Sequence, residues 1–343
     1  LPCIAAFCCP PSHGFCKPVR HSIEGQTLDR PDDIRRINAE VRRVGLDLLQ
    51  TDHILSGIDV ALWDLLGKAR QEPVYRLLGD KKPFGKTAYA SVLFGDTPEV
   101  TFARAQSIRK QGFRAAKFGW GPFGRGSAAA DIAQASAARN GLGERAILLL
   151  DAGTVWGDDL QAAKSRMPEL AELNPLWLEE PFRSEELQAY KALSSCGVAL
   201  AAGEGAHNYG MAKQLVELGG ISYLQIDAGR IGGITTAYQC RRLCERQGTT
   251  FVNHTFTSNL ALSASLQPFA GVERFELAEY PVELKPLARD LAGQRIEPDS
   301  NGLIYAPDRP GLGISPDLNT LRKYLVSVRM ELAGRILYET PPI

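Results

Sequence analysis

The run Ala146-Ile147-Leu148-Leu149-Leu150-Asp151-Ala152 decides the fold, because it has the pattern of a buried strand that ends in a carboxylate. From Thr87 onward, similar apolar or β-branched runs alternate with helical segments, which is typical of βα units around a parallel sheet. Eight such runs predict a closed barrel. The candidate strands are Thr87–Val92, Ala115–Gly119, Ala146–Ala152, Leu176–Glu180, Val198–Glu204, Tyr223–Ala228, Thr250–His254 and Arg274–Tyr280.

Three acids end successive candidate strands: Asp151, Glu179 and Glu204. The carboxyl ends of parallel strands share one face of a barrel, so we expect these side chains to converge. Three neighbouring carboxylates repel one another unless their pKa values rise or a cation lies among them. Mg²⁺ prefers oxygen ligands, and we therefore predict that these acids bind Mg²⁺. The alternative is that each acid caps a helix at the barrel rim.

Polar residues at other strand ends complete a candidate catalytic group. Asp227 ends the strand after Glu204, and His254 ends the next one. A carboxylate bonded to one imidazole nitrogen raises the basicity of the other, which predicts a general base at His254 rather than a satisfied core histidine. Lys117, on the second strand, is predicted to pair with a substrate carboxylate or a developing enolate oxygen. Glu180 is expected to point away from the metal, because side chains alternate along a strand.

The charge of the chain is balanced, with 39 lysines and arginines and 39 aspartates and glutamates in 343 residues. A net charge of zero gives no bulk attraction to nucleic acid or to an anionic membrane. The sequence contains no uninterrupted apolar run of about 18 residues, and its first residues lack the basic region of a signal peptide. We therefore expect a cytoplasmic protein with a small-molecule partner, and neither a nucleic-acid nor a membrane partner.

The cysteines do not form a disulfide framework, because their number is seven and four of them crowd the N-terminus. Cys8, Cys9 and Cys16 with His13 could hold zinc, but their spacing fits no standard finger or ribbon. A disordered or non-native leader is the preferred interpretation of this segment.

Two helical regions flank the candidate barrel. One is expected from about Pro31 to Gly79, and the other is expected at Leu321–Leu337, packed back against the first. We predict an N-terminal capping domain over residues 1–85, a barrel over residues 86–315, and a C-terminal segment, 316–343, that returns to the capping domain.

Several motifs, in this order and spacing, resemble the mandelate racemase/muconate lactonizing enzyme family of the enolase superfamily, over roughly Ser56 to Gly313. The similarity runs through Gly57-Ile58-Asp59-Val60-Ala61-Leu62-Trp63-Asp64, Glu179-Glu180-Pro181, Gly203-Glu204, Asp227-Ala228-Gly229-Arg230-Ile231-Gly232-Gly233-Ile234-Thr235 and Pro310-Gly311-Leu312-Gly313.

The resemblance implies an α/β fold, a modified TIM barrel (β/α)₇β with an α+β capping domain formed from the N- and C-terminal parts. It also implies Mg²⁺ at Asp151, Glu179 and Glu204, and a carboxylate substrate whose enolate the metal stabilises. The eighth strand of the family carries an acid that donates a hydrogen bond to the enolate. Glu279 resembles that acid, with Glu273 and Glu276 as alternatives. Family members tend to be homo-oligomers, dimers or octamers.

Two departures from the family pattern narrow the expected reaction. The second strand of the family often carries Lys-x-Lys, whose second lysine is a base opposite the histidine, but Gly119 stands at that position here. A racemase needs a base on each face, so the sequence favours an acid-sugar dehydratase, which removes water from an aldonic or aldaric acid to give a 2-keto-3-deoxy acid. The β-meander with which the capping domain usually begins is not found before Pro31.

Two rival functions remain open from the sequence. The first is a racemase, epimerase or cycloisomerase of the same superfamily. A lysine would be sought on the sixth strand for such a reaction, but Arg230 stands there, and arginine is a poor base because it stays protonated. The second rival is a non-catalytic scaffold that binds metal, since a fold can outlive its function.

Overall fold

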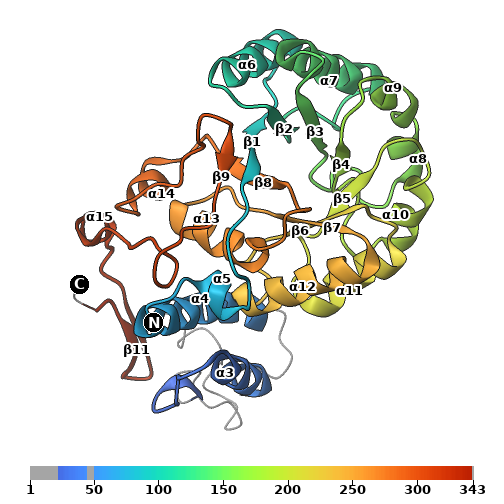
Figure 1. Ribbon diagram of the computed structural model, residues 1–343. Coiled ribbons are helices and arrows are strands. Elements are labelled where there is room, and N and C mark those ends of the chain that lie inside the picture. Colours follow the sequence, from blue (N-terminus) through green and yellow to red (C-terminus); the bar gives the residue numbers. More distant parts are fainter. Residues whose placement is uncertain (1–21, 45–49, 342–343) are drawn as a thin grey trace.

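Eight parallel strands form a barrel that is surrounded by helices (Figure 1). The structure is a computed structural model that describes residues 22–44 and 50–341. The strands lie in the order β7-β6-β5-β4-β3-β2-β1-β8. Their bounds are β1 Lys86–Leu93, β2 Ala115–Gly119, β3 Ile147–Asp151, β4 Trp177–Glu179, β5 Leu200–Ala202, β6 Tyr223–Ile226, β7 Thr250–Asn253 and β8 Leu277–Pro281. The predicted strands are therefore confirmed, although the eighth begins three residues later than expected.

Helices connect the strands and cover the outside of the barrel (Figure 1). Each of the first seven strands is followed by at least one helix, and β8 completes the barrel, so the predicted (β/α)₇β topology is confirmed. The helices are α6 Pro98–Lys110, α7 Ala128–Leu142, α8 Leu160–Lys164, α9 Met167–Glu172, α10 Leu187–Leu193, α11 Tyr209–Leu218, α12 Gly233–Gln247 and α13 Asn259–Leu266, which runs into the 3₁₀ helix η1 Gln267–Phe269. A short helix, α14 Pro286–Asp290, follows β8, and β9 Leu303–Ile304 pairs antiparallel with β1.

A side chain joins the two ends of the sheet. β1 pairs in parallel with both β2 and β8, whereas β7 and β8 are linked through Asn253. The amide of Asn253 accepts a hydrogen bond from the backbone N–H of Glu279 (2.9 Å) and donates one to the carbonyl of Glu279 (3.3 Å). The Asn253 amide therefore takes the place of a backbone ladder between the last two strands.

Alternation along each strand sorts the barrel interior into an apolar layer and a polar layer. Leu149 packs inside the barrel, while its neighbours Leu148 and Leu150 pack against the surrounding helices. Two residues after Leu149, Asp151 points to the same side at the strand end, because side chains two apart share a face. The apolar layer contains Tyr89, Ala115, Leu149, Trp177, Ala201, Val252 and Leu277. This layer forms the floor on which the candidate site lies.

The helices before the barrel form a separate hydrophobic core. They are α3 Pro31–Val44, α4 Gln50–Arg70 and α5 Val74–Leu77, and they replace the single helical stretch expected over residues 31–79. The chain leaves α4 near Pro73, which has no N–H to continue a helix. Leu55, Ile58, Leu62 and Leu66 form a buried stripe on α4, in a cluster that also includes Ile234 of α12.

The predicted C-terminal helix, Leu321–Leu337, is wrong over most of its length. The helix α15 covers Leu318–Tyr324, and a hairpin of β10 Arg329–Leu332 and β11 Arg335–Glu339 follows it. Ala333 and Gly334, between the two strands, both have positive φ, which is the backbone of a tight hairpin turn and is incompatible with a helix. The short apolar run was compatible with either structure, and the turn decided it.

The proposed zinc residues Cys8, Cys9, Cys16 and His13 lie outside the described residues. Among the described cysteines, Cys196, Cys240 and Cys244 are free thiols. None of the helices in the described ranges has the length and apolarity needed to cross a membrane.

Candidate active site

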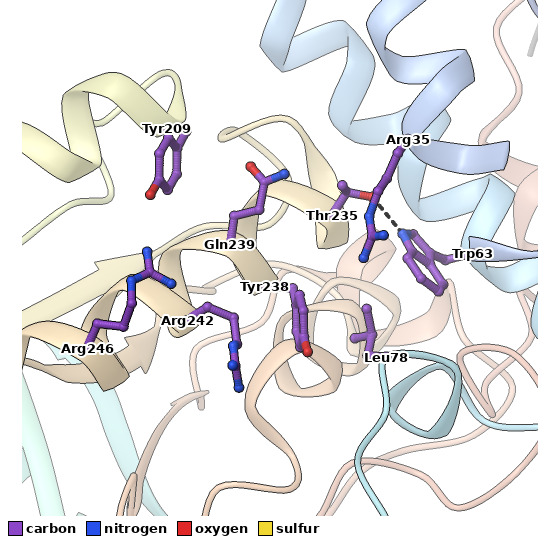
Figure 2. Close-up of a pocket in the computed structure, with 9 residues that line it drawn as sticks. All are labelled: Arg35, Trp63, Leu78, Tyr209, Thr235, Tyr238, Gln239, Arg242 and Arg246. Atoms are coloured by element: carbon purple, nitrogen blue, oxygen red, sulfur yellow. Dashed lines mark hydrogen bonds between the residues drawn. The ribbon is translucent and has the colours of Figure 1, made fainter. Parts of the chain in front are cut away.

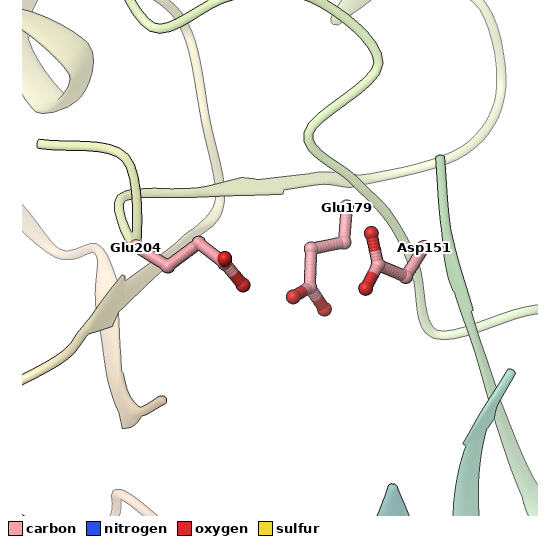
Figure 3. A group of neighbouring side chains, drawn as sticks. All are labelled: Asp151, Glu179 and Glu204. Carbon is pink, nitrogen blue, oxygen red and sulfur yellow. The ribbon is translucent and has the colours of Figure 1, made fainter. Parts of the chain in front are cut away.

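The three predicted metal ligands meet at the carboxyl ends of β3, β4 and β5 (Figure 3). Asp151 and Glu179 are the last residues of their strands, and Glu204 follows β5 by two residues. One carboxylate oxygen from each acid lies within 4.8 Å of the others. Three oxygens at such separations can share one cation, because a hard divalent ion is coordinated by oxygens about 2.0–2.6 Å away.

The ammonium of Lys117 lies among the same carboxylates. Its Nζ is 2.6 Å from Glu179, 2.8 Å from Glu279 and 3.6 Å from Asp151. Burial disfavours the charged amine, but the three carboxylates outweigh burial and raise the pKa of Lys117 well above its usual value. Lys117 is therefore a fixed cation in the site and is bound by protein acids, whereas its predicted pairing with substrate remains a prediction.

Burial also acts on the acids. It raises the pKa of Asp151 to about 6 and that of Glu179 well above its usual value, while the positive charge of Lys117 works in the opposite direction. The indole Nε1 of Trp177 donates a hydrogen bond to Glu179 (3.1 Å), and the Gly153 N–H donates one to Asp151 (2.8 Å). The site thus carries more buried negative charge than one lysine neutralises, which is the electrostatic condition for binding a cation.

The aspartate and the histidine predicted as a catalytic pair are in contact. His254 follows β7 directly, and its Nδ1 lies 2.8 Å from the carboxylate of Asp227, which follows β6. The other nitrogen, Nε2, lies 2.9 Å from Glu204. Burial disfavours the charged imidazole, but Glu279, Glu204 and Asp227 outweigh burial and raise the pKa of His254. Any cation that shared the charge of Glu204 would lower this pKa toward the range of a general base.

Arg230 also contacts this pair, although the sequence pointed to it only as an unsuitable base. Its guanidinium lies 3.1 Å from Glu204 and 3.5 Å from Asp227, and it lies over the ring of Phe256. Burial works against ionisation of Glu204, but the charge and hydrogen bond of His254 outweigh it, and the pKa of Glu204 is lowered. Glu204 is therefore a carboxylate that faces both the other two clustered acids, Asp151 and Glu179, and His254.

Of the three acids considered for the eighth strand, Glu279 is the one in the site. Its carboxylate accepts a hydrogen bond from the Thr255 N–H (2.7 Å), and it lies 3.8 Å from His254 Nε2. Glu273 and Glu276 precede β8 and are exposed. Glu279 lies two residues after Leu277, which packs inside the barrel, so its side chain shares the inward face.

Glu180 is buried next to the proposed metal ligands. Its backbone has a φ of 39°, so the strand alternation from which we expected it to point away ends before it. Its carboxylate accepts a hydrogen bond from the Gly205 N–H (3.1 Å), one residue after Glu204. Burial first, and then the charges of Glu204 and Asp151, raise the pKa of Glu180 to about 7.

A cavity of about 520 Å³ opens above these groups. Lys117, Asp151, Glu204, His254 and Glu279 line it from below. Its walls include residues that sequence analysis did not identify: Ser91, Val92, Leu93, Trp120, Phe256, Pro281 and Glu283. Ser91, Val92 and Leu93 end β1 and Pro281 ends β8, but none of them is an ionisable residue of the kind that marked the other strand ends. Trp120, Phe256 and Glu283 lie in loops, which have no periodic signal.

Lys117→Met provides a test of the site electrostatics. Without a divalent cation, we expect it to lower the free energy of unfolding by about 3–5 kcal/mol at pH 8, because Glu179 and Glu279 lose their buried counter-charge. The loss should shrink at pH 6. In the variant the folded-state pKa of Glu179 lies above its unfolded value, so folding takes up protons and stability falls as pH rises. Urea denaturation in a chelator at both pH values measures the effect.

Lys110→Met, at an exposed position on α6, is the matched control and should change stability by less than about 0.5 kcal/mol. An equal loss for Lys117→Met at pH 6 and pH 8 would contradict this electrostatic account.

Comparisons with known proteins agree with this geometry. Residues 101–320 match the family described as "Enolase C-terminal domain-like", and residues 28–79 match "Mandelate racemase / muconate lactonizing enzyme, N-terminal domain". The D-galactonate dehydratase of Variovorax paradoxus is 30% identical over 77% of this chain and 71% of that protein. The 3,6-anhydro-alpha-L-galactonate cycloisomerase of Streptomyces coelicolor is 28% identical over 79% of this chain and 72% of that protein.

A solved structure shows closer similarity. The crystal structure of a "predicted Mandelate racemase" from Rhodobacter sphaeroides superposes with a TM-score of 0.94 and 51% sequence identity, over 99% of this chain and 88% of that chain. The matched families together cover the capping helices and the barrel from α6 onward. The chain is therefore an enzyme of the mandelate racemase/muconate lactonizing enzyme family of the enolase superfamily.

Proposed function

We propose that the chain removes the proton α to a carboxylate in a Mg²⁺-dependent reaction and so dehydrates an aldonic or aldaric acid to a 2-keto-3-deoxy acid. The observation that carries the proposal is the position of His254. Its Nδ1 is held by Asp227, while its Nε2 is directed toward the three clustered acids. A base and a cation site on one cavity are the two requirements for abstracting a weakly acidic α-proton.

The residues at the strand ends fit Mg²⁺. Asp151, Glu179 and Glu204 offer only oxygen donors, and three ligands leave positions open for water or substrate. Members of the superfamily use Mg²⁺. When bound, the ion would supply Lewis-acid stabilisation of the negative charge that develops on the substrate carboxylate as the proton leaves.

The described residues that line the cavity include no second histidine and no lysine besides Lys117, which favours dehydration over racemisation. Gly119 has no side chain, so the position at which the family often carries a second lysine offers no proton acceptor here. Lys117 is held as a cation by its acid neighbours and is a poor proton acceptor. Among the described residues that line the cavity, His254 is then the group suited to accept a proton.

One histidine can serve both halves of a dehydration. In its neutral form, His254 accepts the α-proton at Nε2, and Asp227 stabilises the imidazolium that results. The imidazolium can then return the proton to the departing β-hydroxyl, which leaves as water. The remaining enol becomes the 2-keto acid by proton transfer to the β-carbon. Proton removal and proton return at one nitrogen balance the reaction without a second base.

The product identifies the reaction. We expect the native chain with Mg²⁺ to convert at least one member of a panel of aldonic and aldaric acids to a 2-keto-3-deoxy acid, as measured by ¹H NMR. Sugar-acid lactones belong in the same panel, because some curated relatives are cycloisomerases, including the D-galactarolactone cycloisomerase of Agrobacterium fabrum. Isomerisation of a lactone without loss of water would assign cycloisomerisation to the chain in place of dehydration. Bound Mg²⁺ with no reaction of any acid would favour a non-catalytic scaffold.

A further inference from the structure

A buried aspartate of the capping helices contacts the first turn of α12, the helix that follows Asp227. Asp59 of α4 is fully buried, and its carboxylate accepts hydrogen bonds from the backbone N–H of Thr235 (3.0 Å), the Thr235 hydroxyl (2.5 Å) and the Asn38 amide (2.5 Å). Trp63, one turn further along α4, donates its indole N–H to the same hydroxyl (2.9 Å), as Figure 2 shows. A Cβ on Gly233 would overlap the Asp59 carboxylate, so the close approach requires glycine.

These contacts satisfy backbone N–H groups in the first turn of α12. The N-cap residue of the helix itself provides no side-chain acceptor for them. The N-cap residue is Gly232, which has no side chain to accept a hydrogen bond from the first turn. The Asp59 carboxylate provides this acceptor from another part of the chain, and its negative charge suits the positive end of the helix dipole. Ser56 of α4 accepts a further hydrogen bond from the Gly232 N–H (2.8 Å).

The clamped end of α12 lies five residues after the catalytic aspartate. The segment from Asp227 to Gly232 connects β6 to α12, and it folds back on itself. The N–H groups of Arg230 and Ile231 donate to the Asp227 carbonyl (3.0 and 3.1 Å), and the Gly229 N–H donates to the Asp227 carboxylate (2.7 Å). Since β6 fixes one end of this segment, the Asp59 contacts fix the other.

We propose that Asp59 is a positioning residue for the reaction, and that it holds the Asp227–Gly232 segment so that Asp227 stays in contact with His254. The inference rests on the proposed function, because it assigns Asp59 a part in the same proton transfer. Asp59 does not touch the cavity, and it acts through the backbone of α12.

The charge of Asp59 is itself unfavourable to folding. Burial raises the pKa of Asp59 to about 6. At neutral pH the fold therefore buries a carboxylate whose charge would be better solvated in water. A group that served only to join the helices to the barrel could be apolar at lower cost. The geometry at Thr235, together with this cost, supports a role in orientation.

Asp64 provides a matched control on the same helix. Its carboxylate accepts a hydrogen bond from the Leu312 N–H (2.9 Å) and pairs with Lys68 (2.6 Å). It therefore links α4 to the 310–313 loop, and both of these partners lie outside the Asp227–Gly232 segment. A general loosening of the capping helices should appear in both variants, whereas a positioning effect should appear only at Asp59.

Steady-state kinetics provide the first arm of the test. We expect Asp59→Ala to lower kcat about 10- to 100-fold with little change in KM, because a small displacement of a reacting group has effects of this size. Asp59→Asn, which retains the shape and an acceptor oxygen, should recover most of the activity, and Asp64→Ala should leave kcat unchanged. In an Asp227→Asn background, Asp59→Ala should have little further effect. Additive losses, or equal losses at Asp59 and Asp64, would overturn the proposal.

Hydrogen–deuterium exchange provides a second arm that requires no turnover. We expect Asp59→Ala to speed exchange of the amides in residues 229–231, whereas Asp64→Ala should speed exchange only near residues 311–313. Thr235→Val removes the hydroxyl that bonds to Asp59 and Trp63 but keeps the backbone N–H that bonds to Asp59. It should show a smaller effect in the same peptide and serves if Asp59→Ala does not fold. Unchanged exchange at residues 229–231 overturns the proposal. If the native chain acts on no acid, the proposed function fails, and this arm still decides the role of Asp59.

Discussion

We expect His254→Asn to lower the rate of α-proton removal about 10²- to 10⁴-fold, because asparagine can keep a hydrogen bond to Asp227 but cannot take up a proton. Mg²⁺ binding should persist in this variant, since the three acids remain. Stopped-flow or steady-state turnover of the substrate found in the panel measures the first effect, and calorimetry with Mg²⁺ measures the second.

His207→Asn is the matched control for this substitution. His207 contacts His53 (2.9 Å) at the surface and does not line the cavity, so its replacement should leave turnover within about twofold of the native value. Full activity of His254→Asn would remove the histidine from the mechanism, and equal losses in both variants would point to a general structural effect.

The second large effect is expected at the metal site. Glu179→Gln should weaken Mg²⁺ binding by more than about 100-fold, because changes in outer-sphere partners alone reduce metal affinity 10- to 100-fold, and this change removes the charge of a proposed ligand. Titration calorimetry on chelator-treated protein measures the affinity. An ion that binds only the folded state raises the melting temperature, so Mg²⁺ should raise the melting temperature of Glu179→Gln less than that of the native chain.

Glu172→Gln, at an exposed position on α9, changes the same residue type outside the site and should bind Mg²⁺ as the native chain does. Native affinity in Glu179→Gln would show that the acid cluster is not the Mg²⁺ site.

Much of the barrel could be predicted from the sequence, because strands of a parallel barrel are short apolar runs with polar residues at one end. Asp151, Glu179 and Glu204 were recognisable by this position, and the structure brings them together. Asp227 and His254 follow the same logic, since each directly follows its strand and the two are in contact.

Features that depend on contacts between distant segments were not accessible in this way. The Lys117 ammonium is bound by Glu179 and Glu279, which are 62 and 162 positions further along the chain, and no local pattern links them. Asn253 closes the barrel through its amide, which looks like any strand residue in sequence. The C-terminal hairpin was missed because the short apolar runs in this stretch fit a helix or a strand, and the positive φ of Ala333 is visible only in the structure.

The measurement that tests the central claim most directly is the fate of the α-proton in D₂O. The ¹H NMR resonance of the α-proton would be followed for each acid of the panel, with the native chain in Mg²⁺ and in a chelator. We predict that the resonance disappears for at least one acid in Mg²⁺, through exchange or conversion to product, and persists in the chelator. Persistence with every acid, although Mg²⁺ is shown to bind, would contradict the assignment of this site to α-proton abstraction.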